Sequence, residues 1–216
     1  ALINGDRKEA RKVIENAMKT GITANTVYTD IIWPIMVQIE KLAREDHITP
    51  AQEHLAVRIN RTIVDQLQNK LPRKQENNKR IVICCSENES KELGAQITAD
   101  LFESDGWEVK FLGGGLNNED ILSFVNEFGP DILLVYGTAP DQAPGLRQLI
   151  DRIKEVNAWE DMQIMVSGGL FNRADGLWQE MGADLYAETG EEAVELASGR
   201  KEMNITTERV LNQRKR

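Results

Sequence analysis

The chain has 216 residues, of which 41% are apolar and 28% are charged, so its composition is that of a folded globular protein and excludes fibrous and most disordered classes. Its formal net charge of −9 disfavours nucleic-acid binding by this segment, because phosphate backbones repel an acidic surface. No apolar run approaches the ~18 residues of a spanning helix, and the N-terminus lacks the apolar core of a secretion signal. We therefore expect a cytoplasmic protein that contacts no membrane.

Helical periodicity characterises residues 1–71. A first amphipathic helix ends at Gly21, and a second helical stretch spans residues 24–44, where Pro34 is expected to kink or break it. A third helix begins at Thr49, whose hydroxyl can cap the free amides as part of a capping box. Because each apolar stripe must be buried against another, we expect a four-helix cap domain.

After a polar linker over residues 72–80, short apolar runs alternate with helical segments. Runs that are apolar on both faces predict a parallel sheet covered by helices, and right-handed crossovers favour a doubly wound, flavodoxin-like sheet of five strands. We expect an α/β fold, with the helical bundle cap first, the sheet domain over residues 81–199 and a basic tail over residues 200–216. The predicted strands are Arg80–Cys85, Trp107–Gly113, Asp131–Gly137, Gln163–Gly169 and Ala183–Glu188. The predicted helices are Lys91–Ser104, Glu119–Phe128, Leu146–Val156, Ala174–Met181 and Glu191–Ala197.

Ligands of a doubly wound sheet bind outside the carboxyl ends of its strands, so we expect function in the loops that follow the strands. None of these loops has the glycine spacing that cradles phosphates, and the triple glycine Gly113–Gly115 is interpreted as a flexible turn. Gly168 and Gly169 either let a ligand approach the backbone or form a simple tight turn. Cys84 and Cys85 face opposite sides of a strand and are interpreted as buried small hydrophobes.

No group of residues in the sequence supports catalysis. The two histidines, His47 and His54, lie in the helical half and have no cysteine or serine spaced as a nucleophile. Glu53 and His54 are adjacent on the third helix and point about 100° apart, so they make no two-ligand metal face. We therefore expect that the chain is not an enzyme.

Three segments carry a family resemblance: the opening Leu2–Ala10, the cap segment Ile48–Ala56 with its Glu-His pair, and the last strand and helix over Gly182–Val194. Together with the order of elements, they resemble the cobalamin-binding sensory modules of light-responsive, cobalamin-dependent MerR-type repressors. The corrinoid modules of methionine synthase are similar more distantly. The resemblance implies cobalamin between cap and sheet, and signalling to a transcriptional output through an attached or separate domain, a partner protein or self-association.

Several functional positions of that family are changed here. Its lower-ligand motif Asp-x-His-x-x-Gly corresponds to Glu89–Gly94, so a lysine stands where the family has the cobalt-ligating histidine. Tyr136 replaces a serine that lines the slot for the nucleotide tail, and its ring would fill much of that slot. Ala43 replaces a tryptophan that covers the upper corrin face, whereas the Gly168-Gly169 motif is kept. The candidate cofactor-binding residues are Glu89, Lys91, Gly94, Tyr136, Thr138, Gly168, Gly169, Ala43, Glu53 and His54.

Lys91 is a poor substitute for the histidine, because a lysine ligates a metal only as the free amine. Lowering its pKa from about 10.4 to neutrality costs about 4–5 kcal/mol before any bond forms. We therefore expect a non-catalytic regulatory module in which tail-down cobalamin binding is lost or replaced. The site then has no cofactor, another planar tetrapyrrole, or cobalamin that keeps its own base. Alternative functions are a genuine cobalamin-binding photosensor, a corrinoid carrier for a methyltransferase, and a protein that binds a peptide or protein in the cleft.

Overall fold

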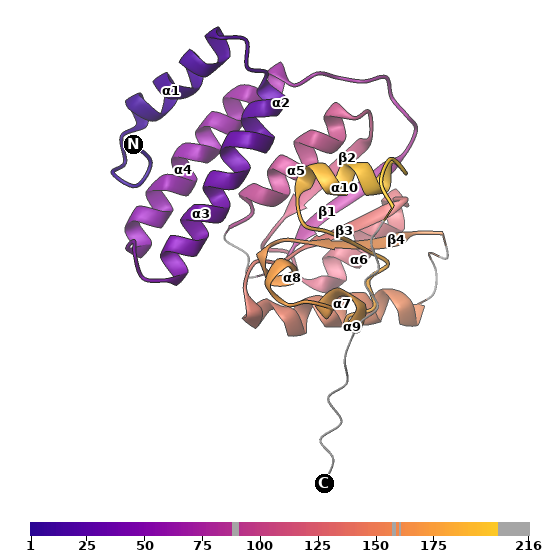
Figure 1. Ribbon diagram of the computed structural model, residues 1–216. Helices are drawn as coiled ribbons and strands as arrows, with labels where there is room; N and C mark the ends of the chain where they lie inside the picture. The colour runs from indigo at the N-terminus through magenta and orange to yellow at the C-terminus, as the bar shows by residue number, and fades with distance from the viewer. Residues whose placement is uncertain (88–90, 157–158, 160, 203–216) are drawn as a thin grey trace.

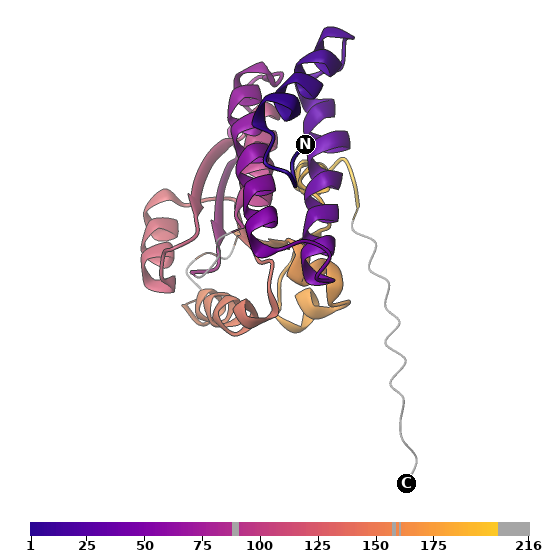
Figure 2. The ribbon, with the colours of Figure 1, turned by 90° about the vertical axis from the view of Figure 1, so that its left-hand side faces the viewer.

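The computed structural model describes residues 1–87, 91–156, 159 and 161–202. It contains a helical bundle at the N-terminus and a domain built on a parallel sheet, packed side by side (Figure 1). Figure 2 looks at the molecule from the bundle side and shows the bundle in front of the sheet domain. The predicted α/β class with an N-terminal helical cap is confirmed.

The bundle consists of three long helical segments. They are α1 (Arg7–Lys19), a continuous helix made of α2 (Ala24–Thr26), the π-helical η1 (Val27–Ile32) and α3 (Trp33–Arg44), and α4 (Pro50–Leu67), which ends in the 3₁₀ turn η2 (Gln68–Lys70). Pro34 does not break the second segment, because it lies in the first turn of α3, directly after a π-helical turn that loosens the register of the backbone hydrogen bonds. The cap that the sequence predicts as four helices therefore consists of three long helical segments.

The predicted capping box at the start of α4 is confirmed. The amide of Gln52 donates to Thr49 Oγ1 at 3.2 Å, and the amide of Thr49 donates to Gln52 Oε1 at 2.9 Å. Two otherwise unpaired amides are satisfied in this way, which fixes where the helix begins.

The sheet has five parallel strands in the order β2-β1-β3-β4-β5, as the flavodoxin-like prediction required. The strands are β1 (Arg80–Cys85), β2 (Glu108–Gly113), β3 (Ile132–Tyr136), β4 (Gln163–Ser167) and β5 (Leu185–Ala187). The helices between and after them are α5 (Leu93–Ser104), α6 (Asn118–Phe128), α7 (Ala143–Val156) after the 3₁₀ turn η3 (Pro140–Gln142), α8 (Gly169–Arg173), α9 (Leu177–Glu180) and α10 (Gly190–Ala197).

The predicted helix Ala174–Met181 is wrong in its form. The structure has the short helix α8 directly after Gly168 and a separate α9 that starts only at Leu177. Gly176 has φ of +74°, which is left-handed backbone, so the chain turns there instead of continuing one helix.

The two faces of the sheet pack against different layers. Cys85 belongs to the cluster that contains residues of the bundle, α5 and α10, whereas Cys84 belongs to the cluster formed with α6, α7 and α8. Both cysteines are buried, as interpreted from the sequence. Because bundle and sheet share one continuous hydrophobic cluster, the bundle is held against this side of the sheet domain.

Within the described ranges, no helix combines the length and the apolar character that crossing a bilayer requires.

Candidate ligand-binding cleft

A cleft of about 450 Å³ lies between α3 of the bundle and the carboxyl ends of the strands. Its bundle side includes Trp33, Met36 and Val37, and its sheet side includes Gly94 and Tyr136. This is the place where doubly wound sheets bind ligands, and its volume lies in the range of small-molecule sites.

The bundle wall of the cleft is apolar. Val37 is 53% exposed although it is a large hydrophobic residue, and Trp33 and Met36 are half-buried beside it. The sequence comparison with the repressor family placed an upper-face tryptophan at Ala43, but Ala43 lines an adjoining hollow. Trp33, earlier on the same helix, provides the aromatic wall instead. The spacing of residues 33, 36, 37 and 40 on one helical face could have indicated this.

Tyr136 closes the sheet side of the cleft. It is the last residue of β3, where it is paired with Cys85 of β1 and Ser167 of β4, and it is only 6% exposed. Its ring lies between two glycines. A Cβ atom on Gly94 would overlap Tyr136 Oη, and one on Gly168 would lie 3.1 Å from Tyr136 Cε1. The phenol ring therefore fills the space beside these two glycines.

Two ion pairs cross the cleft from the bundle to the sheet domain. Lys91 Nζ lies 2.7 Å from Glu53 Oε1, and Arg173 on α8 is paired with Glu40 on α3. Arg44 also lies 3.5 Å from the Glu40 carboxylate. Because Lys91 and Glu53 are in direct contact, a flat ligand that lies between them must first separate them.

A third ion pair fixes Glu92 beside the cleft. Arg61 Nη2 lies 2.6 Å from Glu92 Oε1, and the amide of Gly114 donates to Glu92 Oε2 at 3.0 Å. Burial raises the pKa of Glu92, but the hydrogen bonds from Arg61 and Gly114 outweigh it, and the pKa is lowered below its ordinary value. The triple glycine is thus a turn, as interpreted, and one of its amides also binds this carboxylate.

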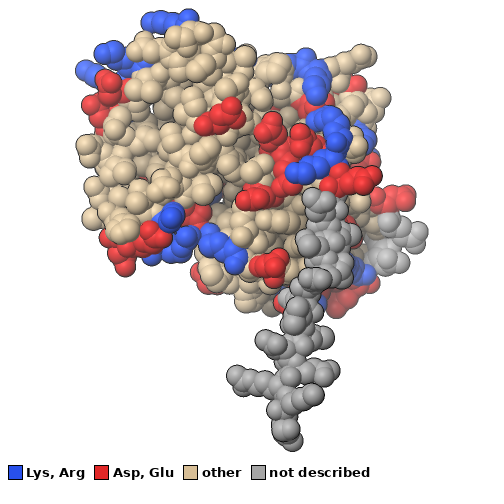
Figure 3. Space-filling view, viewed as in Figure 1, with Lys and Arg blue, Asp and Glu red and all other residues tan. Residues whose placement is uncertain are grey.

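Figure 3 shows this charge pattern on the surface: basic and acidic side chains intermix near the lower end of α3, where it meets α8, while much of the bundle above is uncharged. The ion pairs of Glu40 lie in this region. The Glu40 carboxylate at the rim of the cleft is therefore already paired within the protein.

The structure brings most of the sequence-predicted site residues together. Those that line the cleft are Lys91, Gly94, Tyr136, Thr138, Gly169 and Glu53. Gly168 packs beneath Tyr136, and Glu89 lies outside the described residues. His54 does not line the cleft: it is exposed in an adjoining groove, where its Nε2 accepts a hydrogen bond from Arg58 Nε at 3.1 Å. Residues of the cleft that the sequence did not indicate include Trp33, Met36, Val37 and Arg173.

The chemistry of the cleft is that of a binding site. Among the described residues, no group of three or more His, Cys, Asp or Glu side chains is placed to hold a metal ion. The wall of Trp33, Met36 and Val37 suits a flat, largely apolar ligand, whereas the Arg173–Glu40 ion pair occupies the space next to the backbone of Gly169.

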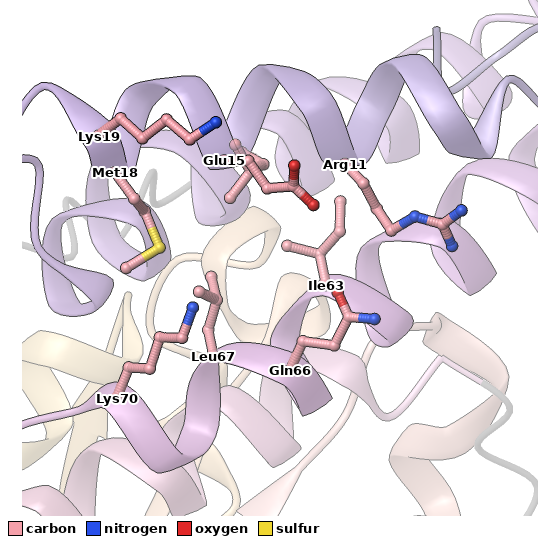
Figure 4. A pocket seen from close by; sticks show the side chains of 9 residues that line it. Arg11, Glu15, Met18, Lys19, Ile63, Gln66, Leu67 and Lys70 are labelled. Atoms are coloured by element: carbon pink, nitrogen blue, oxygen red, sulfur yellow. The ribbon is translucent and has the colours of Figure 1, made fainter.

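A second pocket, of about 360 Å³, lies between α1 and α4 (Figure 4). Met18, Ile63 and Leu67 form its apolar part, and Arg11 and Lys70 are among the charged residues around them. This pocket includes no residue from a strand end, so the cleft is the stronger candidate.

Comparison with protein families gives a match to each half of the chain. A family described as the B12 binding domain matches residues 79–197, and a second B12 binding domain family matches residues 1–68. A corrinoid protein of Desulfitobacterium hafniense is 31% identical over 120 residues, which cover 55% of this chain and 54% of that protein. The chain spans about half the length of the curated relatives it matches.

Solved structures share the fold. The monomethylamine corrinoid protein of Methanosarcina barkeri superposes with a TM-score of 0.81 at 19% identity and covers 93% of this chain and 95% of its own. A chain of the methanol:cobalamin methyltransferase complex of the same organism gives a TM-score of 0.53 at 16% identity, covering 93% of this chain and 76% of its own. At such identities the likeness concerns the fold, bundle and sheet domain together.

Proposed function

Since this chain belongs to the B12 binding domain family, we propose that it is the corrinoid-binding subunit of a methyl-transfer system. In this proposal the chain itself catalyses no reaction: it holds a corrinoid between bundle and sheet and presents it to a separate methyltransferase. The similar Desulfitobacterium protein is named a corrinoid protein, and one structural relative comes from a methyltransferase complex. These similarities favour a carrier over the light-responsive repressor suggested by the sequence, because none of them is described as a repressor or photosensor.

The cleft at the strand ends is the observation that carries the proposal. In a family that binds B12, an apolar wall of Trp33, Met36 and Val37 facing the carboxyl ends of a parallel sheet suits one side of a corrin ring. A ring that covers the exposed Val37 would be stabilised by the contact, since burying apolar surface contributes about 25 cal/mol per Å².

The sheet side of the cleft does not fit a cobalamin that is held from below by a protein side chain. Lys91 stands where the family has its ligating histidine, and its Nζ is paired with Glu53. Tyr136 occupies the space into which a displaced nucleotide tail would have to pass. No role of this chain is therefore assigned through a bond to cobalt. The corrinoid would supply the cobalt chemistry when bound, and the chain's residues would position it and shield it from water.

A regulatory module is a second candidate, and the ion pairs across the cleft favour it. Lys91–Glu53 and Arg173–Glu40 join the two parts of the chain directly, so opening of the bundle would be a discrete change that a partner could sense. Such a module would act without a cofactor or with another planar tetrapyrrole, and it would signal to an attached or separate output.

The two candidates differ in what the chain retains. The full chain is incubated separately with hydroxocobalamin, cobinamide, haem and biliverdin, desalted, and its absorption spectrum recorded. A carrier retains one corrinoid per chain, and it retains neither haem nor biliverdin. Retention of haem or biliverdin alone, or of no pigment, contradicts the carrier and selects the regulatory module.

Two valines provide a matched control for the location of the ligand. Val37 and Val13 are both helical and both 53% exposed, but only Val37 lines the cleft. Val37→Glu should abolish corrinoid retention, because a carboxylate would be buried against the ring. Val13→Glu should leave it unchanged. Equal effects of the two substitutions would place the corrinoid elsewhere.

A further inference from the structure

We propose that Tyr136 restricts the cleft to corrinoids that lack a lower nucleotide arm, of which cobinamide is the simplest. This inference rests on the proposed function and names its ligand class. It assigns to Tyr136 a role in specificity: the phenol ring excludes the arm and leaves the corrin ring accessible to the apolar wall above.

The side chain of Tyr136 is closely packed and only 6% exposed. β1 and β4 flank the central strand β3 that ends with Tyr136, and the ring belongs to the hydrophobic cluster shared with the bundle. Gly94 at the start of α5 and Gly168 after β4 both lack the Cβ that would collide with the ring. The ring therefore fills a channel that these two glycines would otherwise line, and a close-packed interior has no room for a second group there.

The nucleotide arm of a complete cobalamin has two possible positions, and neither is free. When its base is displaced from cobalt, the arm must extend below the ring, where Tyr136 lies. When the base stays on cobalt, it forms a second layer between the ring and the sheet side of the cleft, where Leu93 and Gly94 lie.

Lys91 and Glu53 are consistent with this ligand class. An arm-less corrin ring has to part the Lys91–Glu53 pair on entry, and both groups can then reach the polar amide substituents at the ring's edge. Lys91 and Glu53 must move apart to admit the ring, and the Lys91 side chain, which is 45% exposed, can reorient.

The test measures affinities of the full chain for cobinamide and for hydroxocobalamin by quenching of tryptophan fluorescence, with absorption spectra of the complexes. The wild-type chain should bind cobinamide at least about tenfold more tightly than hydroxocobalamin. Tyr136→Ser should remove this preference by strengthening hydroxocobalamin binding, whereas Tyr136→Phe, which keeps the ring, should preserve it. Circular dichroism verifies that each variant is folded.

Each outcome bears on one of the two claims. Equal or tighter binding of hydroxocobalamin by the wild-type chain overturns the role of Tyr136 and leaves the proposed carrier function intact. Binding of neither corrinoid by the wild-type chain or by Tyr136→Ser contradicts the carrier function itself, and the inference falls with it. Should Tyr136→Ser fail to fold, the wild-type preference and its retention in Tyr136→Phe still decide the matter.

Discussion

Asp100 links the stability of this protein to pH at the contact between bundle and sheet domain. It is 5% exposed on α5, and its carboxylate accepts hydrogen bonds from Tyr28 Oη at 2.9 Å and from Gln68 Nε2 at 3.0 Å. Tyr28 Oη also lies 2.9 Å from the carbonyl oxygen of Val64, so one phenol proton faces two acceptors. A protonated Asp100 would donate to Tyr28 Oη and free the phenol proton for Val64.

Burial is the main reason why the pKa of Asp100 rises from its ordinary value of 3.8 to about 6. The negative charges of Glu103 and Asp65 raise the pKa further, whereas the hydrogen bonds from Tyr28 and Gln68 lower it. Because the folded state binds this proton more tightly than the unfolded state, the contribution of Asp100 to stability is fully present below about pH 4 and is lost as the pH rises to about 6. The loss amounts to about 3 kcal/mol, since one pKa unit corresponds to about 1.4 kcal/mol.

Asp100→Asn tests this reasoning, because an asparagine resembles the protonated acid at every pH. The variant should equal the wild type in free energy of unfolding near pH 4 and exceed it by up to about 3 kcal/mol at pH 8. Urea unfolding, followed by circular dichroism across this range, gives the difference directly. The exposed Asp151→Asn serves as control and should change stability by less than about 1 kcal/mol at all pH values. A difference between Asp100→Asn and wild type that does not vary with pH would refute the reasoning.

Three further substitutions test individual contacts. Gly94→Ala should lower the free energy of unfolding by about 1–3 kcal/mol, because the new methyl group overlaps Tyr136 Oη. The loss should shrink when Tyr136→Ser is also present, and equal losses in both backgrounds would exclude this contact. Asn60→Leu should lower the free energy of unfolding by less than about 1 kcal/mol or raise it, since neither polar atom of the fully buried amide has a hydrogen-bond partner among the described residues. A loss above about 2 kcal/mol in urea unfolding would show that the amide has a partner. Glu53→Gln should raise the affinity for cobinamide about fivefold, measured by fluorescence titration, because the ring no longer has to break the ion pair with Lys91. Weaker binding by the variant would mean that Glu53 holds the ligand.

The sheet domain could be predicted from the sequence because its signals are local. Runs such as Ile81–Cys85 are apolar on both faces, and the structure buries both faces of β1. The capping box at Thr49 is likewise complete within four residues. The split of the predicted helix over Ala174–Met181 was missed because Gly176 was read as part of a helix, although its left-handed backbone turns the chain.

The cleft could be predicted only in part. The sequence indicates Tyr136 and Lys91 because Tyr136 ends a recognisable strand and Lys91 lies in the loop after the first strand. The partner of Lys91, however, depends on how the bundle docks. Glu53 is 38 positions away in the chain, and Arg173 is 133 positions from Glu40. Contacts at such separations leave no periodic signal, so the ion pairs that cross the cleft were beyond reach of the sequence pattern.

The central claim is that the cleft holds a corrin ring without a protein nitrogen beneath its metal. Electron paramagnetic resonance of cobinamide, bound to the full chain and reduced to the cobalt(II) state, tests it most directly, because cobinamide brings no base of its own. The account predicts a bound species whose cobalt lines show no splitting from an axial nitrogen. A nitrogen triplet that disappears in Lys91→Met would put Lys91 Nζ on cobalt and contradict it.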